Sequence, residues 1–239
     1  MAEKWRISMA GCSDRRAVGM ATVLKKALSG LYYGLSPLAR RILPKPVLRF
    51  LLLNVVGVNH PYAEILGNPG RLFMEQELLP WLRERYRRIL FVGTASYAWH
   101  YEKLFDQDPD QYTTLDSRPG AAVWGAPTHI VARIEDIGRH RPGEFFDCIV
   151  FNGVFGFGID SPVDMRAAAK AMHDALRPGG VLIVGWNTDL HADPEELGVL
   201  SPHFARTDQT PWGQTRRYPA ELHVYDFYVK SPRETPTGR

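Results

Sequence analysis

Two apolar runs and the segment between them decide the fold: FDCIVF at residues 146–151 and VLIVGW at 181–186, separated by a helical segment at 162–176 and the turn RPGG at 177–180. Neither run alternates with polar residues, which is typical of strands buried on both faces of a parallel sheet. The proline and glycines of the turn stop the helix. The sequence therefore predicts a strand, a helix and a second strand in this order.

The same alternation of short apolar runs and helical segments extends over the chain after residue 88. It predicts a doubly wound, mostly parallel α/β sheet with helices on both faces. We expect further strands at 88–92, 111–115, 129–134 and 222–230, and further helices at 97–105 and 194–200.

The first 87 residues have helical rather than strand patterns. A basic segment at 17–28 and an amphipathic segment at 71–87 have helical spacing. Ser36 is a typical helix cap, and apolar residues at helical spacing follow over 38–56, where Pro44 must break or kink the helix. We expect an N-terminal helical extension or lid over 1–87, an α/β domain over 88–230 and a frayed tail over 231–239.

Composition excludes several classes of protein. The chain has 239 residues, of which 45% are hydrophobic, and a net charge of +3, which is ordinary for a globular domain. Two cysteines, Cys12 and Cys148, and eight histidines without a close ligand pair do not suit a structural metal. The longest apolar run, at 50–58, is too short to cross a bilayer, and no signal-peptide core is present. We therefore expect a cytoplasmic protein without a metal.

Doubly wound sheets bind ligands beyond the carboxyl ends of their strands, so the loops that follow the predicted strands are candidate sites. The first loop contains Gly93, Thr94, Ala95 and Ser96, whose small side chains let a ligand approach the backbone amides. A tight strand-to-helix turn without a ligand explains the same residues. The fourth loop begins with Asn152 and Gly153 and suits the wall of a pocket, although a flexible loop over an apolar patch is the alternative.

Acidic residues follow the second and third predicted strands. Asp116, followed by Ser117, lies about 20 residues after Gly93, the spacing at which a carboxylate accepts hydrogen bonds from ribose hydroxyls. A helix-capping or turn aspartate is the alternative interpretation. After the third strand, Glu135 could accept from an exocyclic amine or could equally be a solvated acid at a helix start.

These loops, in this order, resemble those of the class I S-adenosylmethionine-dependent methyltransferases over residues 88–230. The segments FDCIV and LRPGGVLIV are similar to the family pattern F-D-x-I followed by L-x-P-G-G-x-L-x-I. The first glycine motif is divergent: only Gly93 is retained, whereas Phe91 stands at the usual acidic position and Ala95 and Tyr97 at the other glycines.

The resemblance implies a Rossmann-like sheet of seven strands with an antiparallel last strand, S-adenosylmethionine as cofactor, and methyl transfer to a small-molecule acceptor. It implies that the following residues bind the cofactor: Gly93, Thr94, Ala95, Ser96, Asp116, Ser117, Ile134, Glu135, Asn152 and Gly153. His100 and Tyr101 are weak candidates for a base, as are His129 and His191, and each suits a purely structural role as well. The aromatic residues that could line an acceptor pocket are Tyr97, Trp99, Phe155, Phe157 and Trp186.

Two other functions remain open from the sequence. The divergent glycine motif also suits a catalytically inactive, methyltransferase-like binding or scaffold protein. An oxidoreductase is disfavoured because no G-x-G-x-x-G motif is present. We expect no nucleic-acid partner, because no basic stripe with interleaved aromatics is found. The segment 36–58 either packs on the α/β domain or makes a peripheral contact with an anionic membrane surface.

Overall fold

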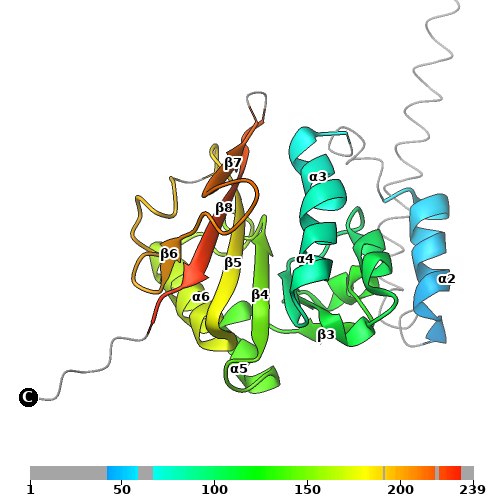
Figure 1. Cartoon of the computed structure of the whole chain (residues 1–239). Helices are drawn as coiled ribbons and strands as arrows, with labels where there is room; N and C mark the ends of the chain where they lie inside the picture. The colour runs from blue at the N-terminus through cyan, green and yellow to red at the C-terminus, as the bar shows by residue number, and fades with distance from the viewer. Residues whose placement is uncertain (1–41, 59–66, 191, 219–220, 233–239) are drawn as a thin grey trace, which may run out of the picture. The chain divides into compact units, whose positions relative to one another are not determined.

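The computed structural model describes residues 42–58, 67–190, 192–218 and 221–232 (Figure 1). The chain divides into two compact units, Met1–Pro61 and Tyr62–Arg239. The predicted boundary at residue 87 therefore falls within the second unit, and the predicted helix at 17–28 lies outside the described residues. In the first unit, α2 (Lys45–Phe50) continues into the π-helix η1 (Leu51–Val56), which ends at Gly57 with a positive φ of 70°. Ile42 is helical, Leu43 and Pro44 are not, and α2 begins at Lys45, so the helical path breaks at Pro44 as predicted.

The second unit is built on one mixed sheet with the strand order β3-β2-β1-β4-β5-β8-β6 (Figure 1). The strands β1 to β5 pair in parallel, whereas β8 is antiparallel to β5. The prediction of a doubly wound, mostly parallel sheet with an antiparallel last strand is confirmed. The strands are β1 (Ile89–Val92), β2 (Tyr112–Asp116), β3 (Thr128–Val131), β4 (Phe146–Asn152), β5 (Leu176–Asn187), β6 (Phe204–Arg206), β7 (Thr215–Arg217) and β8 (His223–Lys230).

The short strand β7 pairs with β8 beside the main path of the sheet and brings the number of strands to eight. It consists of a threonine and two arginines, so it has no apolar run from which a strand could have been predicted. Its existence depends on pairing with β8, which is a tertiary effect.

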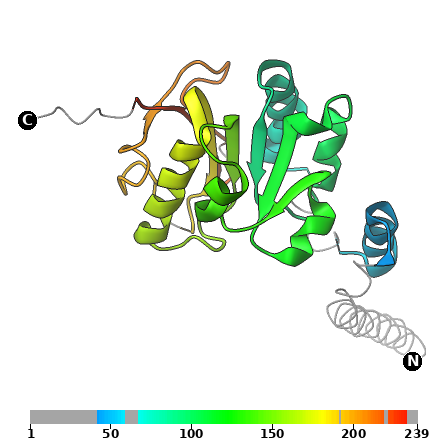
Figure 2. The same cartoon turned by 90° about the horizontal axis from the view of Figure 1, so that it is seen from below.

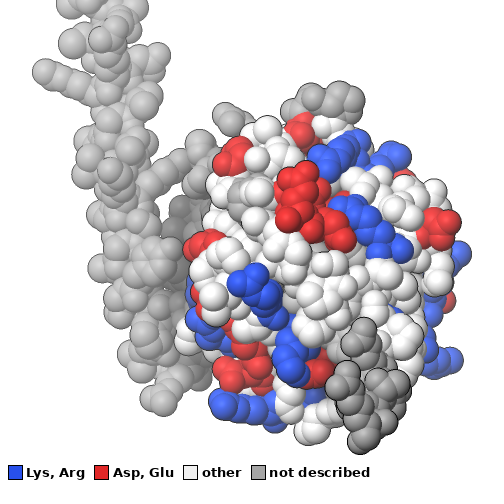
Figure 3. Space-filling model, turned by 90° about the vertical axis from the view of Figure 1, so that its left-hand side faces the viewer, with Lys and Arg blue, Asp and Glu red and all other residues white. Residues whose placement is uncertain are grey.

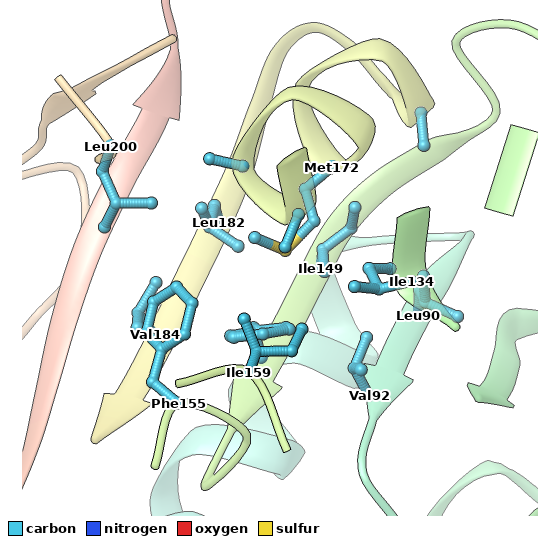
Figure 4. Packing of buried hydrophobic residues seen from close by; sticks show 14 of the residues in the cluster. Leu90, Val92, Ile134, Ile149, Phe155, Ile159, Met172, Leu182, Val184 and Leu200 are labelled. Carbon is cyan, nitrogen blue, oxygen red and sulfur yellow. The ribbon is translucent and has the colours of Figure 1, made fainter. Parts of the chain in front are cut away.

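Helices cover both faces of the sheet, as the strand composition requires (Figure 2). Alternate residues of β1 enter two different cores: Leu90 and Val92 pack with Met172 of α6 (Pro162–Ala175), whereas Phe91 packs on the opposite face with Leu79. Figure 4 shows the first core, in which Met172 lies over the strand residues. Because both faces are buried, the strands contain apolar residues at successive positions rather than at every second one.

One helical stretch, Pro69–Arg85, packs on the face of the sheet opposite α6 and consists of three segments. The segments are α3 (Pro69–Phe73), the π-helical turn η3 (Met74–Leu78) and α4 (Leu79–Arg85). Pro80 lies in the first turn of α4, directly after the π-helical turn, where its missing amide costs least. The predicted amphipathic helix at 71–87 therefore forms, and its buried side is the one that faces the sheet.

Two local predictions were wrong. The segment 194–200 forms turns rather than a helix, because Asp193 accepts from the Glu195 amide at 2.9 Å and Gly198 adopts a φ of 60°. The third strand ends at Val131, because the chain turns into a 3-10 helix at Ile134–Asp136. The segment predicted as a helix at 97–105 forms the 3-10 helix η4 (Trp99–Phe105).

A buried carboxylate joins β8 to β5, β6 and β7. Asp226 is fully buried, and its oxygens accept hydrogen bonds of 2.7 Å from Trp186 Nε1, Arg206 Nη1 and Thr215 Oγ1. Each donor comes from a different strand. A buried charge is tolerated only when it is paired and hydrogen-bonded, and here both conditions are met.

We expect Asp226→Ala to lower the free energy of unfolding by about 3–5 kcal/mol, because Arg206 would lose its buried counter-ion. Urea unfolding followed by circular dichroism measures this. The matched control is Asp136→Ala, which removes an exposed ion pair with Arg139 and should cost less than about 1 kcal/mol. A cost at Asp226 no larger than that of the control would show that the network is not structural.

Candidate functional site

A cavity of about 720 Å³ lies at the carboxyl ends of the strands in the second unit. It opens where β1 lies between β2 and β4, which is the point at which the connections turn to opposite sides of the sheet. Ligands of doubly wound sheets bind at this switch point. The cavity therefore lies at the strand ends, where the sequence predicts a site.

Gly93 forms the part of the wall directly after β1. Its φ of 88° lies in the left-handed region, and a Cβ there would meet Val154 Cγ2 at 3.3 Å and the Asn152 carbonyl oxygen at 3.4 Å. Both the conformation and the close approach of the β4 loop favour glycine. The absence of a side chain leaves the backbone after β1 accessible from the cavity, as a ligand that lies across the strand ends requires.

The Asp116 carboxylate lies at the end of β2 and is only 6% exposed. Its Oδ2 accepts from the Thr94 amide at 2.9 Å and from Arg118 Nη2 at 2.9 Å. Its Oδ1 accepts from the Arg118 amide at 2.9 Å and from Arg118 Nε at 3.0 Å. Thr94 Oγ1 is a more distant fifth donor, 3.5 Å from Oδ2. A carboxylate has about four lone-pair positions, so the four shorter hydrogen bonds fill its hydrogen-bonding capacity. The Arg118 side chain supplies two of them and is itself 70% exposed.

Burial alone would raise the pKa of Asp116, but the hydrogen bonds from Arg118 and from the Thr94 amide outweigh it, so the net shift is downward. The group is therefore an anion at neutral pH. If the Arg118 side chain swings into solvent, one lone pair becomes free on each carboxylate oxygen. Two neighbouring hydroxyl groups, such as those of a ribose, would use such a pair of positions.

Most of the other predicted cofactor residues line the cavity. Besides Gly93 and Asp116, seven of them line it: Thr94, Ala95, Ser117, Ile134, Glu135, Asn152 and Gly153. Ser96 is buried but is not among the lining residues. Glu135 pairs with Arg133, whose Nη2 lies 2.6 Å from Glu135 Oε1.

Arg71 of α3 contributes a buried positive charge that the sequence patterns did not indicate. Its side chain is 6% exposed and pairs with Glu75 at 2.7 Å, and its guanidinium carbon lies 4.4 Å from the centre of the Tyr97 ring. Its Nε is buried without a hydrogen-bond partner among the described residues. A buried donor without a partner is costly, so this group is suited to an anionic ligand atom in the cavity.

The Tyr97 ring therefore covers Arg71 and does not point away from the site, and Asp116 is turned inward rather than to solvent. This arrangement leaves the hollow open despite the divergent glycine motif. Of the other predicted aromatics, Phe157 lines the cavity, whereas Phe155 and Trp186 belong to the core. Trp99 lies outside the cavity wall.

The predicted bases are poorly placed for proton transfer. His100 does not line the cavity and lies 3.4 Å from Glu75. Tyr101 does line it, but burial raises the pKa of its phenol far above neutrality, so it stays protonated. His129 is hydrogen-bonded to Thr114 Oγ1 at 2.8 Å and does not line the cavity, and His191 lies outside the described residues.

Sequence reasoning missed Asn187 and His223, which line the cavity together with Asn152. His223 Nδ1 lies 2.6 Å from Asn187 Oδ1, and Nε2 lies 3.0 Å from Asn152 Oδ1. Burial lowers the pKa of His223 to about 4 from an ordinary value of 6.5, so the ring is neutral at physiological pH. Asn187 ends β5 as Asn152 ends β4, so the strand-end rule could have indicated it. His223 begins an antiparallel strand, and its place at the same edge follows only once β8 pairs with β5.

Solved structures of methyltransferases share this fold. An N-methyltransferase, NodS from Bradyrhizobium japonicum WM9 in complex with S-adenosyl-L-homocysteine, superposes with a TM-score of 0.51 at 20% identity, over 71% of this chain and 92% of that one. The 1,6-didemethyltoxoflavin-N1-methyltransferase of Burkholderia thailandensis gives a TM-score of 0.51 at 17% identity, over 80% and 91%. The chain therefore has the class I methyltransferase fold. No protein-family model and no curated protein matches the sequence.

We expect His223 to make stability depend on pH between about 6.5 and 4. In this range the unfolded chain binds a proton at His223 and the folded chain does not, so the free energy of unfolding falls as the pH is lowered, by a total on the order of 3 kcal/mol. The measurement is urea unfolding at several pH values for the wild type and His223→Phe. An identical pH dependence in both proteins would contradict the buried neutral imidazole.

Proposed function

We propose that this protein, which has the class I methyltransferase fold, binds S-adenosylmethionine in the cavity at its strand ends and transfers the methyl group to a small molecule. The observation that carries the proposal is the buried Asp116 carboxylate beside Gly93, because this pair provides an anionic acceptor and open backbone at the switch point. Titration calorimetry with S-adenosylhomocysteine tests it. No binding at millimolar ligand would overturn it.

The described residues suit the parts of such a cofactor. Asp116 would hold the ribose hydroxyls once Arg118 has moved, and Ile134 and Glu135 would lie beside the adenine. Arg71, with its unpartnered Nε, would pair with the carboxylate of the methionine part. The cavity of about 720 Å³ lies within the usual range of small-molecule sites and leaves room for an acceptor.

The residues of the chain would act mainly by binding and alignment. When bound, S-adenosylmethionine supplies an electrophilic methyl group on a sulfonium. The wall residues would hold the acceptor in line and keep bulk water out, and alignment of this kind accounts for much of the rate of a displacement. Tyr101 stays protonated and His100 lies off the wall, so neither supports a base-dependent mechanism.

A methyltransferase-like protein without activity is the second candidate, and the occupied Asp116 carboxylate favours it. Arg118 takes the two positions that a ribose would need. If Arg118 stays in place, the protein would not bind the cofactor, and adding the cofactor would not change the melting temperature. A ligand that binds the native state must stabilise it, so a rise in melting temperature with S-adenosylhomocysteine excludes this alternative.

The predictions about nucleic-acid and membrane partners remain predictions. On the face shown in Figure 3, basic and acidic side chains lie beside one another and form no large area of a single sign. Among the described residues, no helix is both long enough and apolar enough to cross a bilayer. The peripheral membrane contact through 36–58 stays a prediction, and exposed Phe50 and Val55 in its described part are compatible with it.

We expect Asp116→Ala to weaken binding of S-adenosylhomocysteine by about 1.5–3 kcal/mol, because hydrogen bonds to a charged group would be lost. Titration calorimetry measures the change. Asp147→Ala is the matched control: Asp147 also accepts two backbone amides, from Arg87 at 2.8 Å and Arg88 at 3.0 Å, but it lies at the amino end of β4 and does not line the cavity. Equal affinities for the wild type and Asp116→Ala would exclude a role in ribose binding.

We expect Arg118→Ala to tighten binding of S-adenosylhomocysteine about two- to fivefold, because an exposed ion pair worth up to about 1 kcal/mol no longer competes for the carboxylate. Arg139→Ala, which removes a similar exposed pair with Asp136, should leave the affinity unchanged. Weaker binding by Arg118→Ala would mean that the arginine contacts the ligand and does not compete with it.

A further inference from the structure

Three polar side chains from three different strands form one hydrogen-bonded group in the cavity wall. Asn152 ends β4, Asn187 ends β5 and His223 begins β8, and the imidazole lies between the two carboxamides at 3.0 and 2.6 Å. The register pairs Asn187 with His223 across the antiparallel strands. We call this group the Asn–His–Asn group. All three residues line the cavity, and the second polar atom of each carboxamide has no hydrogen-bond partner among the described residues.

The backbone below the group is shaped to hold it. Gly185 of β5 pairs with Asn152 in the parallel register. A Cβ at Gly185 would lie only 1.9 Å from Asn152 Oδ1 and 2.8 Å from His223 Nε2. Glycine in the interior of a buried strand is unfavourable unless another group must approach closely. Here the close approach is that of Asn152 and His223, so the missing side chain of Gly185 leaves the space that the group occupies.

A neutral imidazole in this position forces the two asparagines to differ. The neutral ring has one N–H and one bare nitrogen, so it donates to one neighbour and accepts from the other. One asparagine therefore turns its carbonyl oxygen to the ring and the other turns its amide nitrogen, which a half-rotation of the carboxamide permits. The atoms left for the cavity are consequently of opposite kind: one asparagine presents N–H donors and the other presents a carbonyl acceptor.

Charged side chains near the group are already engaged. Glu221 lines the cavity, and both its oxygens lie 3.1 Å from the Gly70 amide nitrogen. Tyr225 lies on the same side of β8 as His223, with its ring centre 4.7 Å from that of the imidazole, and donates to the Gly70 carbonyl at 3.0 Å. This end of the cavity therefore combines the uncharged hydrogen-bonding atoms of the Asn–His–Asn group with the Glu221 carboxylate, and the described residues there supply no positive counter-ion for an anion.

We infer that the Asn–His–Asn group selects the methyl acceptor: the substrate is an uncharged molecule that offers both a hydrogen-bond donor and an acceptor, such as a lactam or a hydroxylated nitrogen heterocycle. This rests on the proposed function, because it assigns the acceptor end of the same cavity. His223 is a positioning residue that sets which asparagine donates and which accepts. A negatively charged group would be disfavoured, because it would lose its hydration and meet the Glu221 carboxylate without gaining a counter-ion.

The first test reads the protonation of His223 itself by ¹⁵N NMR of the imidazole. At pH 8 we expect one protonated and one bare nitrogen in the wild type. A carboxylate only accepts, so Asn187→Asp should place the proton on Nδ1 and Asn152→Asp should place it on Nε2. Asparagine and aspartate are nearly equal in size, so neither replacement introduces a steric clash. Two protonated nitrogens in the wild type, or the same tautomer in both variants, would overturn the inference.

The second test uses uracil as the probe, with two matched relatives: 1,3-dimethyluracil lacks donors, and orotate adds a carboxylate to the same ring. Saturation-transfer NMR with S-adenosylhomocysteine present should show uracil binding at least tenfold tighter than either relative. His223→Phe should abolish this preference. His173→Phe, at a buried histidine that does not line the cavity, should keep it. Equal binding of the three probes to the wild type would refute the inference.

A separate titration with S-adenosylhomocysteine alone distinguishes the two proposals. If it binds and the three uracil probes bind alike, the proposed function stands and the acceptor class is wrong. If it does not bind while uracil is still preferred, the acceptor-end chemistry stands and the proposed function fails.

Discussion

The hydrogen bond from the Thr94 amide to the Asp116 carboxylate, at 2.9 Å, is the interaction on which the site depends. It joins the loop after β1 to the end of β2, two segments that parallel pairing brings side by side. With this bond in place, Gly93 keeps its left-handed conformation and the carboxylate is held inside the protein. An anion at the switch point would otherwise be solvated and free to turn outward, and no hollow with a fixed acceptor would exist there.

Charge is distributed along the cavity in a way that follows from burial. Asp116 keeps its negative charge because several donors surround it, and Arg71 keeps its positive charge through Glu75 and the Tyr97 ring. In the part of the wall formed by the Asn–His–Asn group, His223 has no charged partner, and burial leaves it neutral. The cavity thus has an anionic wall, a cationic wall and an uncharged polar wall, which is a suitable arrangement for a zwitterionic cofactor beside a neutral second molecule.

Two positions of the chain require glycine because another segment approaches the backbone closely there. Gly93 allows the loop of β4 to approach β1, and Gly185 makes room for Asn152 and His223. The family's glycine motif is otherwise eroded, yet the hollow persists because Tyr97 turns to Arg71. The motif is therefore a poor measure of whether a ligand fits, since the path of the backbone matters more than the number of glycines.

The sequence by itself determined the sheet, because apolar runs without alternation fit only strands buried on both faces, and it placed Gly93, Asp116 and Asn152 at one edge through the strand-end rule. It did not determine β7, the turns at 194–200, or the roles of Arg71, Asn187 and His223. Those depend on which segments far apart in the chain become neighbours. Arg71 reaches the cavity only when α3 packs on the sheet, and His223 reaches Asn152 only when β8 pairs antiparallel to β5. Local patterns carry no record of such pairings, because their energy arises from contacts that exist only in the folded chain.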